Sequence, residues 1–187
     1  INISENKLLL ISTHTIGSFT ISDSTNISIS RLSPPCDIGF MDINEACYYQ
    51  TDLDVLQIFI DNSIATLNMD MDIDNNLVID PLELGDQYWN DGRITSLLCD
   101  NCGLSGYIPS EIGSFEELIS LSLGVNQLSG EIPSEIGSLL NLTSLKLYSN
   151  QLSGGIPLEI GNLVNLTTLY LYSNYLSGII PSEIGNL

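Results

Sequence analysis

The chain of 187 residues carries 23 Asp and Glu against four Lys and Arg, a formal net charge of −19, and 43% of its residues are hydrophobic. This hydrophobic content supplies a core for one or two compact units. The charge excludes nucleic acid as a partner, because phosphates require clustered cations. No apolar run approaches the roughly 18 residues that a membrane helix needs, so we expect no membrane insertion.

Residues 1–35 are predicted to form a β-rich N-terminal segment. Apolar and polar side chains alternate over residues 19–21 and 27–29, and residues 8–11 form a short apolar run, which together predict two or three strands. So few strands are seldom stable alone, so we expect them to pack on the rest of the chain or on a neighbouring molecule. The start at Ile1, with neither an initiator Met nor a signal peptide, is expected of a processed secreted chain.

Residues 36–93 are predicted to form an acidic helical cap. Residues 37–92 hold 13 Asp and Glu and no Lys or Arg, a negative field that favours divalent cations. A helix over residues 51–69 is predicted by apolar residues on one helical face, namely Leu53, Leu56, Ile60, Ile64 and Leu67. A second, shorter helix over 81–88 is predicted to begin at Pro81, with Asp80 as its cap.

Between these predicted helices lies the segment DIDNNLVIDPLE, which resembles an EF-hand calcium loop with Asp72 in its first position. The resemblance implies a calcium ion bound by Asp72, Asp74, Asn76, the carbonyl of Val78, Asp80 and Glu83. One residue departs from the motif, because the sixth position, normally Gly, is Leu77, which is expected to lower the affinity or distort the loop. A metal-free acidic turn is the alternative.

Residues 94–187 repeat with a period of 24, in blocks 94–117, 118–141, 142–165 and the incomplete 166–187. Each block reads LxxLxLxxNxLSGxIPxEIGxLxx, and the segments LSGYIPSEIG, LSGEIPSEIG, LSGGIPLEIG and LSGIIPSEIG resemble the plant-receptor subclass of leucine-rich repeats. The resemblance implies a right-handed solenoid of stacked coils, each a strand followed by a return segment. Leu145 and Leu147 would point into the coil, because side chains alternate along a strand. Recurrent Asn126, Asn150 and Asn174 would form an amide column that satisfies backbone groups.

Side chains between the core leucines are predicted to face the concave sheet. The candidate binding surface is a tyrosine cluster around one lysine, comprising Lys146, Tyr148, Tyr170, Tyr172 and Tyr175, since tyrosine offers rigid contact area with a polar tip. The alternative is that tyrosine merely suits a half-exposed strand. An acidic row on the return side, Glu111, Glu135, Glu159 and Glu183, is expected to be solvated.

Four cysteines and four Asn-X-Ser/Thr sequons indicate a secreted or cell-surface protein. We favour disulfides Cys36–Cys47 and Cys99–Cys102, although four cysteines permit three pairings. Redox chemistry is disfavoured because no thioredoxin-like βαβ unit surrounds the CxxC segment. The candidate glycosylation sites are Asn2, Asn26, Asn141 and Asn165.

No catalytic function is expected, because the one histidine, His14, stands alone and no phosphate loop, nucleophile elbow or zinc spacing occurs. Two functions remain. The favoured one is a calcium-stabilised extracellular interaction and assembly scaffold, joined head to tail with copies of itself in a filament, because the last repeat ends at Leu187 without a polar cap. The alternative is a recognition or adhesion module that binds a protein or glycan on its tyrosine-rich concave face.

Overall fold

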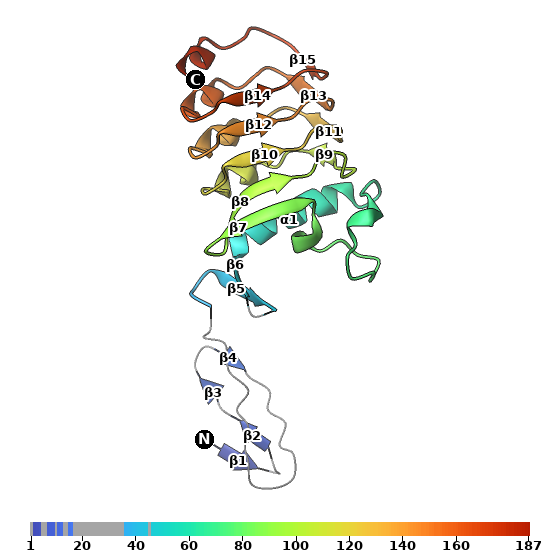
Figure 1. Cartoon of the computed structure of the whole chain (residues 1–187), viewed down its shortest axis with the longest axis vertical. Helices are drawn as coiled ribbons and strands as arrows, with labels where there is room; N and C mark the ends of the chain where they lie inside the picture. Colours follow the sequence, from blue (N-terminus) through green and yellow to red (C-terminus); the bar gives the residue numbers. More distant parts are fainter. Residues whose placement is uncertain (1, 5–6, 10, 13–14, 17–35, 45) are drawn as a thin grey trace.

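A computed structural model describes residues 2–4, 7–9, 11–12, 15–16, 36–44 and 46–187 of the chain (Figure 1). At the N-terminus, strand β1 (Asn2–Ser4) pairs antiparallel with β2 (Lys7–Leu9), and β3 (Ile11–Ser12) pairs antiparallel with β4 (Thr15–Ile16). The strands predicted over 19–21 and 27–29 lie outside the described residues. Within the described part of the chain, no helix is long and apolar enough to cross a membrane.

The cap begins with a hairpin that the sequence did not predict. Strands β5 (Phe40–Ile43) and β6 (Ala46–Tyr49) pair antiparallel, and the Cys36–Cys47 disulfide ties the hairpin to the residues before it. Helix α1 (Gln50–Ser63) follows directly. It is shorter than the predicted helix 51–69 and ends before Ile64, which continues the apolar period but is 80% exposed.

The second predicted helix, 81–88, is wrong beyond its first turn. The 3₁₀ turn η1 (Met69–Met71) precedes the loop, and only the single 3₁₀ turn η2 (Pro81–Glu83) follows it. Residues after η2 form strand β7 (Asp86–Asn90), which pairs antiparallel with β8 (Arg93–Leu98). Asp91 and Gly92 between them both have positive φ, as a tight hairpin turn requires. A strand is favoured over a helix here because the strand covers the edge of the repeat sheet.

The repeats form the predicted solenoid, with two parallel sheets (Figure 1). The concave sheet continues from β7 and β8 through β10 (Ser120–Ser122), β12 (Ser144–Lys146) and β14 (Thr168–Tyr170). The second sheet joins β9 (Ser105–Tyr107), β11 (Gln127–Gly130), β13 (Gln151–Gly154) and β15 (Tyr175–Leu176). The 3₁₀ turns that close the coils are η3 (Ser110–Ser114), η4 (Ser134–Ser138), η5 (Leu158–Asn162) and η6 (Ser182–Asn186).

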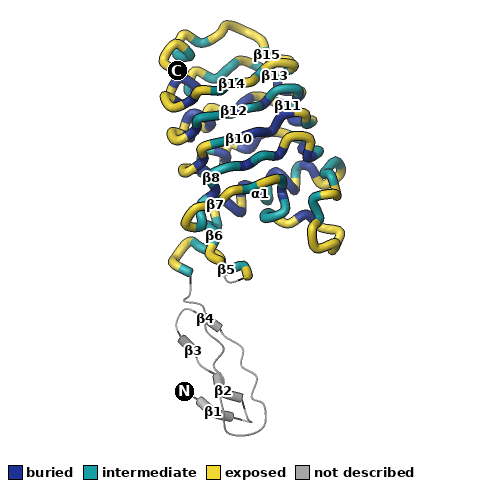
Figure 2. Tube along the Cα trace, viewed as in Figure 1, coloured by how far each residue is buried: buried dark blue, intermediate teal, exposed yellow. Residues whose placement is uncertain are grey.

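The coil interior is filled as the repeat pattern predicts, with Leu145 and Leu147 fully buried. Figure 2 shows buried segments recurring through the stacked coils. The amide column is also present. Asn150 accepts a hydrogen bond from the Leu128 N–H (3.0 Å) and donates to the Leu123 carbonyl (2.8 Å) of the preceding coil. Asn126 and Asn174 make equivalent bonds. Each amide therefore accepts from a backbone N–H of the preceding coil that would otherwise be buried without a partner.

The cap and the first coil share one continuous core, and the buried Asp52 ties helix α1 to strand β8, which leads into the first coil. Asp52 of α1 has no exposed surface and accepts hydrogen bonds from Arg93 Nε (3.0 Å), Arg93 Nη2 (3.2 Å) and the Ile94 N–H (2.9 Å). Burial raises the pKa of Asp52 above its usual value, and these hydrogen bonds oppose that shift. The guanidinium also lies 4.1 Å from the centroid of the Tyr49 ring. Helix α1 is thus held on the open end of the first coil.

Candidate functional site

Three tyrosine rings cluster on the concave sheet at the β12–β14 end, with Tyr170 and Tyr172 exposed and Tyr148 half-buried. Tyr148 stacks on Tyr172 with ring centroids 5.1 Å apart, and Tyr170 lies 6.4 Å from Tyr148 and 5.9 Å from Tyr172. The Lys146 ammonium lies 5.9 Å from the Tyr170 centroid. We call Lys146, Tyr148, Tyr170 and Tyr172 the tyrosine patch. The register Lys146↔Tyr170 brings these side chains together, since parallel strands align equivalent repeat positions.

Tyr175 does not belong to the patch, contrary to the sequence prediction. It lies on β15, in the second sheet rather than the concave one, and its side chain is exposed. The chain turns between Tyr172 and Tyr175, where Ser173 has a positive φ. Proximity in sequence therefore does not place Tyr175 on the concave face.

Asp100 is a concave-face residue whose role the sequence analysis missed. Its carboxylate accepts hydrogen bonds from the Gly124 N–H (2.6 Å) and from Ser122 Oγ (2.8 and 2.9 Å). The Tyr148 ring lies over Gly124, where any Cβ would collide with it. The Asp100 charge is the main cause of a raised pKa for Tyr148. The signal was present in the repeat column, where Asp100 aligns with Gly124, Tyr148 and Tyr172.

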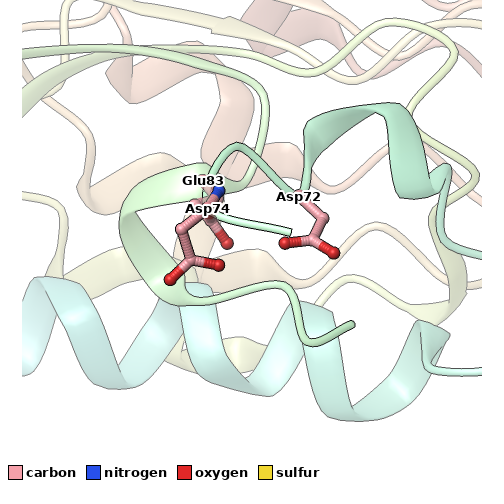
Figure 3. A group of neighbouring side chains, drawn as sticks. All are labelled: Asp72, Asp74 and Glu83. Carbon is pink, nitrogen blue, oxygen red and sulfur yellow. The ribbon is translucent and has the colours of Figure 1, made fainter. Parts of the chain in front are cut away.

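The loop between η1 and η2 brings three of the predicted calcium ligands together (Figure 3). Carboxylate oxygens of Asp72, Asp74 and Glu83 lie within 4.8 Å of one another. Asp72 accepts from the N–H groups of Asn76 (3.1 Å) and Leu77 (2.9 Å). Three like charges at this separation repel one another unless a cation or a proton intervenes.

The other predicted ligands have hydrogen-bond partners of their own. The Asn76 side-chain oxygen accepts from the Val78 N–H (2.7 Å). Asp80 and Glu83 form a reciprocal capping box at η2, in which each side chain accepts from the other's N–H. Leu77, in the position usually held by Gly, has a φ of +70°. The backbone thus makes the expected sharp turn with a residue that adopts it at a cost.

The remaining predicted site residues lie apart from both clusters. Cys99 is bonded to Cys102 in the first coil, as Cys36 is to Cys47, so the disulfides have the favoured pairing. Asn141 and Asn165 are exposed, and each side-chain amide donates to a carbonyl of the preceding coil. Asn2 lies on β1, and Asn26 lies outside the described residues. The acidic row Glu111, Glu135, Glu159 and Glu183 lies at the surface on the 3₁₀ turns.

Comparison with known proteins shows which family the chain resembles. The family model described as Leucine Rich Repeat matches residues 117–139, 141–163 and 165–187. No curated protein matches the chain. Among solved structures, the BIR2 ectodomain from Arabidopsis thaliana is 32% identical with a TM-score of 0.57, and the match covers 72% of this chain and 73% of that one.

Two further solved structures are also similar to this chain. A chain of the BIR3–SERK2 complex from Arabidopsis thaliana is 34% identical with a TM-score of 0.55, covering 71% of this chain and 75% of that one. PEPR1–AtPEP1 is 27% identical with a TM-score of 0.64, covering 73% of this chain but only 20% of that one. The present chain is therefore similar in extent to the short ectodomains and spans a fifth of the long one. It belongs to the leucine-rich-repeat family, in the subclass found in plant receptor ectodomains.

Proposed function

We propose that this chain is a non-catalytic extracellular interaction module that binds a polypeptide segment of another protein on its concave face, at the tyrosine patch. The observation that carries the proposal is the three-ring cluster on the parallel sheet, in which Tyr170 and Tyr172 are exposed. Tyrosine adds contact area with few rotatable bonds, which lowers the entropy cost of binding. The BIR3–SERK2 structure, a complex, supports assembly with another protein chain as the mode of action.

The charges of the concave face restrict the ligand further. Asp86 and Asp100 lie at the cap end, where Asp86 pairs with Leu98 in the sheet register, whereas Lys146 lies within the tyrosine patch. A ligand segment with its basic residues toward the cap and its acidic or aromatic residues toward β14 would match this arrangement. Asp100 is already fixed by two donors, the Ser122 hydroxyl and the Gly124 N–H, so it needs no reorganisation on binding.

The test is selection of peptides from a random display library on the full chain, followed by affinity measurements on the selected peptides. Replacing Tyr170 and Tyr172 by Ala should weaken binding by about 100-fold, the scale of an aromatic hot spot. Tyr175→Ala is the matched control, because this tyrosine is also exposed but lies on the second sheet. Equal loss in the control, or no loss in the double variant, would remove the tyrosine patch as the binding surface.

We further propose that the loop at Asp72, Asp74 and Glu83 binds calcium in a structural role. Three convergent carboxylates and the hydrogen bonds from Asn76 and Leu77 to Asp72 support the proposal, since oxygen ligands suit calcium. The single turn η2, in place of an exit helix, leaves no second helix to reorient, which favours stabilisation over signalling. The ion would offset carboxylate repulsion within the cap.

The filament and glycan-binding functions stay predictions. Ile179 and Ile180 in the last coil are exposed, but such residues are expected equally beside a further coil and beside a second copy of the chain. The contacts of the last coil therefore do not favour head-to-tail assembly over a longer solenoid.

A further inference from the structure

A hollow of about 650 Å³ lies in the cap between the β5–β6 hairpin, helix α1 and the loop that leads into η2. Leu53 lines it and is buried, while Met41 and Ile73 line it with 42% and 77% of their surface exposed. Ile43 and Leu82 complete the apolar lining. The volume lies within the range of ligand-binding pockets, and exposed apolar side chains around a concavity are typical of interaction sites.

No Lys or Arg among the described residues lines the hollow, so without calcium its carboxylates carry an uncompensated negative charge. Asp54, Asp74, Asp80 and Glu83 all line the hollow, and residues 37–92 contain no Lys or Arg. In the described part of the chain, the ion pairs are those of Arg93 with Asp52 and Glu116, and none of these residues lines the hollow. A concavity of one charge sign concentrates its field and attracts ligands of the opposite sign.

We propose that this hollow binds a segment of a partner protein in which apolar side chains are flanked by Lys or Arg. The apolar lining excludes a bare metal ion as the full occupant, because an ion alone would leave Leu53, Met41 and Ile73 without contacts. The carboxylates select cationic residues, whose aliphatic stems can cover the exposed Ile73 and Met41. This second docking surface lies in the cap and is independent of the tyrosine patch.

The experiment measures fluorescence anisotropy of a labelled synthetic peptide, KKLWLKK, titrated with the full 187-residue chain. EDTA is present throughout, so that calcium does not occupy the loop carboxylates Asp74, Asp80 and Glu83, which also line the hollow. We expect saturable binding at low ionic strength that weakens as salt is added. The charge-reversed peptide EELWLEE and the apolar-free peptide KKSSSKK should each bind at least about tenfold more weakly. Absence of saturable binding of KKLWLKK at about 1 mM would overturn the proposal.

Helix α1 supplies a matched pair of charge reversals. Asp54 accepts a hydrogen bond from Gln50 (2.7 Å) and lines the hollow, whereas Asp61 accepts one from Gln57 (2.8 Å) and does not line it. Both are exposed and four residues from their partner. Asp54→Lys should weaken KKLWLKK binding about tenfold, because it places a positive charge at the hollow. Asp61→Lys changes the charge of the molecule equally but outside the hollow, so it should weaken binding less than about threefold.

Two further variants test the apolar contribution to binding and the location of the binding site. Ile73→Ser removes an exposed side chain, so the fold should persist by circular dichroism while KKLWLKK binding weakens at least about fivefold. Tyr172→Ala should leave this binding unchanged, which distinguishes the hollow from the tyrosine patch. Equal effects of Asp54→Lys and Asp61→Lys would mean that binding follows net charge alone and would contradict the proposal.

Discussion

The coils over 94–187 and the cap over 36–93 share one core but are stabilised in different ways. In the coils, each contact recurs every 24 residues, so Asn126, Asn150 and Asn174 each make the same set of backbone bonds. In the cap, each contact occurs once, and the Asp52–Arg93 pair has no equivalent elsewhere among the described residues. Repetition spreads stability over many equal contributions, whereas the cap concentrates it in a few.

This difference predicts that the largest loss of stability comes from a single change in the cap. Asp52→Ala should reduce the free energy of unfolding by about 3–5 kcal/mol, because it removes the buried carboxylate that pairs with Arg93 and leaves the Ile94 N–H without its acceptor. Arg93 then keeps the Ser114 carbonyl and the exposed Glu116 as partners. Urea unfolding measures the effect. Asp54→Ala, in the same helix but exposed, should change the free energy by less than about 0.5 kcal/mol. A loss below about 1 kcal/mol for Asp52→Ala would show that the cap does not depend on this contact.

A change within the amide column tests the coils. Asn150→Ala should reduce the free energy of unfolding by about 2–3 kcal/mol, because it leaves the Leu128 N–H without its acceptor in the interior and removes one of the two amide donors to the Leu123 carbonyl. Asn165→Ala removes one exposed hydrogen bond and should have an effect below about 1 kcal/mol. Similar losses for the two variants would contradict the role of burial.

These contrasts show what the sequence could predict. The repeat pattern placed the concave columns correctly, because identical coils must stack in identical register, and so it predicted that Tyr148, Tyr170 and Tyr172 meet. In the cap, the end of α1 was missed because Ile64 continues the apolar period although its side chain is 80% exposed. The role of Asp100 was missed because its hydrogen bonds reach into the next coil.

Strand β7 was missed for a further physical reason. Residues 84–88 follow a Pro in a helix-starting position, so local propensity predicts that the helix continues through them. The pairing of Asp86–Asn90 with β8 depends on the edge of the repeat sheet, which no local pattern records. Contacts between distant segments thus determine the structure of the cap, whereas the sequence period determines the structure of the coils.

Calcium is the next test, because it would stabilise the cap without affecting the coils directly. Calcium at 100 times its dissociation constant should raise the free energy of unfolding by about 2.7 kcal/mol, and EDTA should reverse the change. Glu83→Gln should abolish this response, whereas Glu111→Gln, on the solvated row, should preserve it. Calorimetry and thermal melting measure binding and stabilisation. No heat of binding and no shift in the wild type would exclude the metal site.

Leu77 sharpens the calcium test within the same loop. Leu77→Gly should tighten calcium binding, because Gly adopts the positive φ of this position without steric cost. Leu77→Ala is the control, since it shortens the exposed side chain but keeps the Cβ that causes the strain. Equal calcium affinities for the two variants would show that the backbone turn does not limit binding.

The smallest expected effect concerns the electrostatics of the concave face. The negative charge of Asp100 is the main cause of the raised pKa of Tyr148, because it disfavours the tyrosinate anion. Asp100→Asn should therefore lower the pKa of Tyr148 toward the ordinary tyrosine value, as measured by NMR titration of the ring. The raised pKa means that the folded chain holds this proton more tightly than the unfolded chain does. The associated stabilisation is fully present below the unfolded-state pKa, near 10, and is lost as the pH rises through the folded-state pKa. Asp100→Asn should flatten this alkaline loss, and an unchanged Tyr148 titration would show that the carboxylate does not act on the tyrosine patch.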